Sequence, residues 1–218
     1  MYQSLLYYDF SSILMLMLMV YGCASVFVKE EETEMKYIVR TSQGGQGRTY
    51  LAKVFSALLF LVVAGVLLNV WDYCLFALWF GGTESAASPL YAIRGFQDTI
   101  LTLTMGQGYM LLSALKITGI CVFCMMFLLF SLAARKGMAA FLLNFVSIMM
   151  CVSAYDYIYN SGHLWNPVSL ISGRNLILRS DFINLAGYPV PQYMIAVGVA
   201  VFLILGIVYT GWMLWRRR

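Results

Sequence analysis

The chain has 218 residues, of which 61% are hydrophobic and 11% are charged; its formal net charge is +4 and its mean hydropathy is +0.79. A water-soluble domain carries about 25% charged residues, so these values exclude a soluble globular protein, a disordered chain and a nucleic-acid-binding protein. The five cysteines are an odd number and do not indicate a disulfide framework. The composition therefore predicts a protein that crosses a lipid bilayer several times.

Five stretches are apolar and long enough to cross a bilayer as helices, which takes about 20 residues each. In chain order they cover residues 10–28, 54–80, 106–134, 137–155 and 192–214. The third is placed by counting back from Ala134, which leaves Lys116 near the far membrane face, where its long side chain can reach water. The prediction is an all-α, polytopic transmembrane helix bundle that forms one domain over residues 1–218.

The basic residues between the spans predict the orientation of the chain. Ten of the fourteen lie on one side of the spans and three lie on the other. The ten are Lys29, Lys36, Arg40, Arg48, Lys53, Arg135, Lys136, Arg216, Arg217 and Arg218, and the three are Arg94, Arg174 and Arg179. Because short loops rich in lysine and arginine stay in the cytoplasm, we expect the N-terminus outside and the C-terminus inside. No basic residue precedes the first span, which argues against a cleavable signal peptide.

The stretch between the first two spans, residues 29–53, has a pattern that indicates function. Four glutamates suit the start of a helix, because the helix dipole favours negative charge there. Three apolar residues follow at the spacing of one helix face, and two basic residues lead into the second span. In chain order these residues are Glu30, Glu31, Glu32, Glu34, Met35, Ile38, Val39, Arg48 and Lys53. The pattern predicts a short cytoplasmic helix that receives a push from a partner; the alternative is a solvated connector that only sets topology.

Residues 157–191, on the predicted outer side, are too apolar for a simple loop. Leu164, Val168 and Ile171 have helical spacing and predict one short helix that dips into the membrane interface. The residues from Asp181 to Leu185 predict the start of a second short helix. Irregular backbone at membrane depth must be covered by protein, so we expect these pieces to pack on the spans. The alternative is a loop that lies on the lipid surface.

The remaining polar residues do not form a recognisable catalytic or metal site. Cys121 and Cys124 are expected to be packing residues inside an apolar helix, and His163 is the only histidine. Asp72 and Asp156 lie near the outer ends of their spans, where a carboxylate can reach water; a role in ion transport would need a buried partner. We therefore predict no enzymatic activity, no cofactor and no metal in this chain.

Three segments of the sequence resemble type-2 ABC exporter permeases. Residues 7–53 resemble the second span of that family and the cytoplasmic segment after it. Residues 88–119 resemble the segment that enters the fourth span, and residues 166–193 resemble the membrane-dipping element before the last span. The residues that match in order in the first segment are Phe27, Glu30, Glu31, Glu32, Glu34, Gly47, Arg48 and Lys53.

The resemblance implies the permease subunit of an ABC exporter in a bacterial plasma membrane. Such a subunit pairs with a second permease chain, and a separate ATPase docks on its cytoplasmic face. Closure of the ATPases would push the segment near Met35–Thr41 and open a path between the two permease chains. The family usually has six spans, so this chain is expected to correspond to a permease without its first span and external domain. The rival hypothesis is a non-ABC membrane protein, such as a small channel or an assembly scaffold.

Overall fold

The computed structural model describes residues 1–33, 45–97, 99, 101–134, 136–157, 166–178, 182–185 and 187–217. Within these residues, five helices are long and apolar enough to cross a membrane, as predicted. The first is the run Tyr2–Glu32, which consists of α1 (Tyr2–Leu6), α2 (Phe10–Ala24) and α3 (Val28–Glu32). The other four are α5 (Gly45–Phe80), α6 (Met105–Ala133), α7 (Gly137–Tyr157) and α10 (Gln192–Arg217). The fold is therefore a helical bundle of the multi-pass membrane type.

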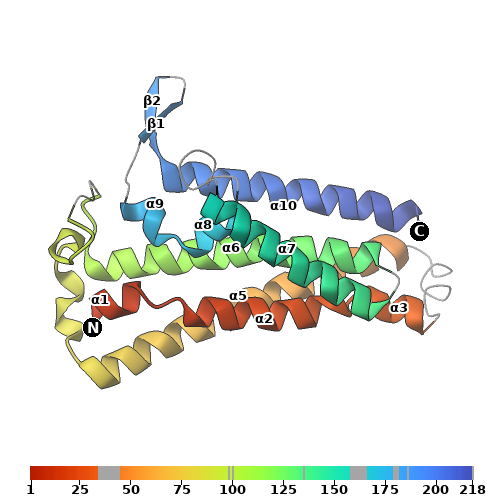
Figure 1. Cartoon of the computed structure of the whole chain (residues 1–218), viewed down its shortest axis with the longest axis horizontal. Coiled ribbons are helices and arrows are strands. Elements are labelled where there is room, and N and C mark those ends of the chain that lie inside the picture. Colours follow the sequence, from red (N-terminus) through yellow and green to blue (C-terminus); the bar gives the residue numbers. More distant parts are fainter. Residues whose placement is uncertain are drawn as a thin grey trace.

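Helix α6 forms the centre of the bundle and packs against α2, α5, α7 and α10 (Figure 1). In its most apolar stretch 61% of the residues are buried, compared with 17% in α5 and α10 and 11% in α7. The helix begins with a capping box, in which the Thr104 hydroxyl accepts from the Gln107 amide and the Gln107 side chain accepts from the Thr104 amide. The peripheral helices leave apolar faces open, as expected for helices that contact lipid.

The two ends of the bundle carry different short elements (Figure 1). One end has α1, the 3-10 helices η1 (Thr83–Ala87) and η2 (Leu90–Ala92), α9 (Arg174–Leu178) and a β-hairpin. The other end has α3 and the C-terminal end of α10. Most of the described basic residues lie at this α3 end: Lys29, Arg48, Lys53, Lys136, Arg216 and Arg217. The charge bias thus maps onto one end of the bundle, which we predict to be cytoplasmic.

Cysteine labelling tests this orientation. Lys29 in α3 and Tyr188 in the hairpin are both exposed and lie at opposite ends of the bundle. In a background that carries Cys74→Ser, which removes an exposed native thiol, an impermeant maleimide should label Tyr188→Cys on intact cells. It should label Lys29→Cys only after the cells are opened. Labelling of both positions from outside would contradict the predicted orientation.

Two short helices follow α7 in the described part of the chain. Helix α8 (Pro167–Ile171) is capped by Asn166, whose side chain accepts from the Val168 amide at 3.0 Å and donates to the Cys151 carbonyl of α7 at 2.6 Å. Helix α8 also packs closely on α6. A Cβ atom on Gly119 of α6 would lie 2.9 Å from the Ile171 side chain, so only glycine fits there without movement.

The prediction that a second helix starts at residues 181–185 is wrong. Phe182–Leu185 form strand β1, which pairs antiparallel with β2 (Tyr188–Pro191). The chain reverses at Gly187, whose φ of 93° lies in the left-handed region that glycine adopts readily. The two prolines of β2 have no N–H group and disfavour a helix that would continue through them. A short hairpin therefore replaces the helix.

Candidate functional site

At the α3 end, Lys53 of α5 attaches the predicted coupling segment to the bundle. Its ammonium group forms an ion pair with Glu30 (Nζ–Oε1 2.8 Å) and donates to the carbonyl of Val26 at 2.7 Å. It also lies 4.9 Å from the centre of the Phe27 ring. The two charged side chains are only 21% and 17% exposed. Three contacts from one ammonium group therefore hold the turn between α2 and α3 against α5.

The ring of Phe27 extends this attachment to α10. It stacks on Tyr50 of α5 with ring centres 5.8 Å apart and packs against Trp215 of α10 at 5.6 Å. The Tyr50 hydroxyl donates to the carbonyl of Val208 at 3.1 Å, and its ring packs edge-on against Trp212 at 5.7 Å. Aromatic pairs in such tilted geometries add to the stabilisation from burial alone. We define the Lys53 cluster as Phe27, Glu30, Tyr50, Lys53, Trp212 and Trp215.

Two hydrogen-bonded contacts connect the same region to α6 and α7. The buried hydroxyl of Ser131 in α6 accepts from the Phe27 amide at 3.2 Å and donates to the Ala24 carbonyl at 3.1 Å. A carboxylate oxygen of Glu32 accepts from the amide of Gly137, the first residue of α7, at 3.1 Å. A carboxylate at a helix N-terminus is also favoured by the helix dipole. Helix α3 and the turn before it therefore contact α5, α6, α7 and α10.

The structure brings together some of the residues singled out in the sequence. Glu30, Glu31 and Glu32 lie in α3, where Glu30 pairs with Lys53 and Glu32 contacts α7. The side chain of Arg48 is exposed. The rest of the predicted coupling segment lies outside the described residues, namely Glu34, Met35, Ile38 and Val39. The coupling helix itself therefore stays a prediction, while the contacts of α3 with the spans are described.

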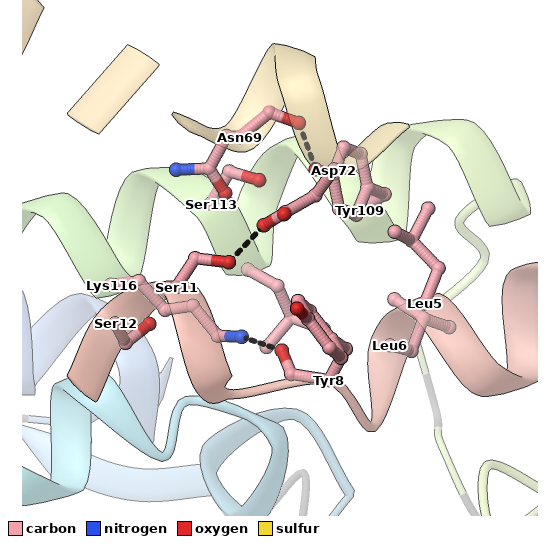
Figure 2. A pocket seen from close by; sticks show the side chains of 11 residues that line it. Leu5, Leu6, Tyr8, Ser11, Ser12, Asn69, Asp72, Tyr109, Ser113 and Lys116 are labelled. Atoms are coloured by element: carbon pink, nitrogen blue, oxygen red, sulfur yellow. Dashed lines mark hydrogen bonds between the residues drawn. The ribbon is translucent and has the colours of Figure 1, made fainter. Parts of the chain in front are cut away.

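A second polar cluster lies toward the opposite end, between α2, α5 and α6 (Figure 2). The carboxylate of Asp72 in α5 accepts a hydrogen bond from the Ser11 hydroxyl in α2. Lys116 of α6 pairs with Asp9 (Nζ–Oδ1 2.7 Å) and donates to the Tyr8 carbonyl at 2.8 Å. We define the Asp72 cluster as Asp9, Ser11, Asp72 and Lys116. Ser11, Asp72 and Lys116 of this cluster line a hollow of about 10 Å³, which is room for about one water molecule.

Two expectations about this cluster are corrected. Asp72 is not open to bulk water, because it is only 8% exposed and Leu5 and Leu6 of α1 line the same hollow. Lys116 does not point to solvent either; its side chain is 12% exposed and its charge is paired with Asp9. The lone charge in an apolar stretch was a signal that a partner was needed. Its partner, 107 residues earlier in the chain, could not be identified from local spacing.

The sequence matches no protein-family model, no curated protein and no solved structure. The resemblance to exporter permeases therefore depends on the order and the sidedness of the segments quoted above. Within the described residues, no group of three histidine, cysteine or acidic side chains is placed to hold a metal ion. The two ion pairs described above lie in the two clusters, one toward each end of the bundle.

Proposed function

We propose that this chain is the permease subunit of a type-2 ABC exporter, driven by a separate ATPase that docks at the α3 end. The observation that carries the proposal is the attachment of α3 to the spans. The Glu30–Lys53 ion pair contacts α5, the Glu32–Gly137 hydrogen bond contacts α7, and the Phe27 ring contacts α10. The predicted ATPase contact near Met35–Thr41 lies in the stretch of sequence between α3 and α5. A displacement of that segment would therefore be passed to three spans.

This attachment favours coupling over the alternative of a simple topogenic connector. A connector that only sets topology needs positive charge but no fixed contact with the spans. Here the Glu30 carboxylate neutralises the charge of Lys53, and both groups are largely withdrawn from water. Burying an ion pair has a desolvation cost that a solvated connector would not incur. The proposal includes a second permease chain and the plasma membrane of a bacterium, as the family resemblance implies.

Co-purification with an ABC ATPase that is co-expressed with this chain tests the proposal. At matched membrane levels, the double variant Ile38→Ala with Val39→Ala should recover several-fold less ATPase than the unmodified chain. Truncating well-packed apolar anchors typically costs more than ~1 kcal/mol each. Lys29→Ala is the matched control, because Lys29 is exposed in α3 and an exposed charge pair is worth about 0–1 kcal/mol. Equal recovery with all variants would mean that this segment only connects two spans.

A further inference from the structure

A groove of about 500 Å³ opens between α1, α5 and α6 on the outside of the bundle. On α5, its lining residues Val66, Asn69, Val70 and Tyr73 follow one helix face. Val66 and Val70 are 46% and 54% exposed, so the groove opens to the surroundings of the bundle rather than to its core. Most of its lining is apolar. The volume falls within the range of about 300–1,000 Å³ that is usual for small-molecule sites.

Three tyrosine rings gather along this groove. The ring centres of Tyr2 and Tyr73 lie 6.5 Å apart, and those of Tyr73 and Tyr109 lie 5.9 Å apart. Hydrogen bonds hold the three hydroxyl groups in place. The Tyr2 and Tyr73 hydroxyls bond to each other at 3.3 Å, and the Tyr109 hydroxyl donates to the Asn69 carbonyl at 2.7 Å. Clustered aromatic faces attract cations and are a known means of binding quaternary ammonium groups.

The Asp72 cluster lies directly behind the tyrosines. Asn69, Tyr109 and Ser113 line both the groove and the small hollow of the cluster, so they form a shared wall (Figure 2). Because Lys116 is paired with Asp9, the carboxylate of Asp72 leaves the cluster with one excess negative formal charge. In the low dielectric of a membrane protein this charge acts over a longer distance than it would in water. The wall of the groove is therefore favourable for a cation.

We propose that this groove binds a cationic amphiphile, a molecule with a quaternary ammonium group on an apolar chain. The ammonium group lies against the tyrosine faces on the Asp72 side, and the chain lies along Val66, Val70 and Met110. Asp72 would repel an anionic head group, and a neutral head group would gain nothing from the charge of Asp72. Binding needs only this chain, so the inference does not depend on the proposed function.

Binding of radiolabelled dodecyltrimethylammonium to the full chain in nanodiscs tests the inference, with empty nanodiscs as the control for partitioning into lipid. We expect saturable binding that Asp72→Asn weakens about tenfold, because the variant removes the negative charge behind the groove wall. Tyr73→Leu should weaken binding about fivefold, whereas Tyr73→Phe, which keeps the aromatic face, should stay within about twofold. Equal binding by the leucine and phenylalanine variants would overturn the role of the tyrosine faces.

A groove-filling variant tests the location of the site without touching the polar groups. Val70→Trp should abolish saturable binding, whereas Leu67→Trp, at an exposed position of α5 outside the groove lining, should leave it unchanged. The same chain with a sulfate head should compete poorly, because Asp72 repels its negative charge. The proposal is overturned if Val70→Trp binds normally, or if dodecyl sulfate competes as well as the cation.

Discussion

Lys53→Met should lower the free energy of unfolding by about 2–4 kcal/mol, because it leaves the carboxylate of Glu30 largely buried without its cation. The variant also loses the hydrogen bond to the Val26 carbonyl and the contact with the Phe27 ring. The free energy is measured by reversible unfolding in mixed detergent micelles. If the proposed function holds, the same variant should also uncouple ATP hydrolysis from transport, since α3 would no longer be fixed to α5.

Two further variants separate the ion pair from the general effect of removing a lysine. Lys29→Met makes the same substitution at an exposed position and should change stability by less than about 0.5 kcal/mol. Adding Glu30→Gln to Lys53→Met should restore part of the lost stability, because an uncharged amide is less costly to bury than a lone carboxylate. If Lys53→Met and Lys29→Met have equal effects, the Lys53 cluster does not stabilise the fold as described.

Gly119→Val should destabilise the bundle by about 1–3 kcal/mol, the usual cost of overpacking a tight contact. A Cβ atom at this position would meet not only Ile171 but also the backbone carbonyl of Pro167, at 3.0 Å. Because a backbone atom cannot rotate away, α8 must shift from α6. Hydrogen exchange should then become faster across residues 167–178, and the unfolding assay should report the loss of stability.

The matched control for this variant is Gly206→Val in α10. Gly206 is exposed and has no neighbouring atom within 4 Å of a built Cβ, so the same change meets no obstacle there. It should leave both the unfolding free energy and the exchange of α8 unchanged. Unaltered exchange of α8 in Gly119→Val would show that this contact does not hold the short helix in place.

The spanning helices could be predicted because the signal for them is local. A run of about 20 apolar residues is long enough to cross a bilayer whatever it packs against. For the same reason the predicted end of the second span, residue 80, agrees with the observed end of α5 at Phe80. The start differs, because α5 already begins at Gly45, where the sequence is polar and hydropathy gives no sign of a helix.

Contacts between distant residues could not be predicted in the same way. The sequence indicated that Glu30 and Lys53 belong to one functional segment, but not that they pair, and it gave no sign that Ser11 would bind Asp72. The error at residues 182–185 has a local cause. A four-residue stretch with three apolar residues fits a helix or a strand equally well, and the decisive signal was the glycine and prolines that follow it.

The central place of α6 also has a consequence for biogenesis. Synthesis proceeds from the N-terminus, so α2 and α5 are made before the helix on which both mainly pack. At that stage Asp9 and Asp72 have been synthesised, whereas Lys116, which neutralises Asp9, has not. Until α6 is made, Asp9 therefore lacks the ion-pair partner that it has in the folded chain. The contact that joins the segment before α2 to the third span can form only once that span has been synthesised, so this end of the bundle is completed after the first two spans.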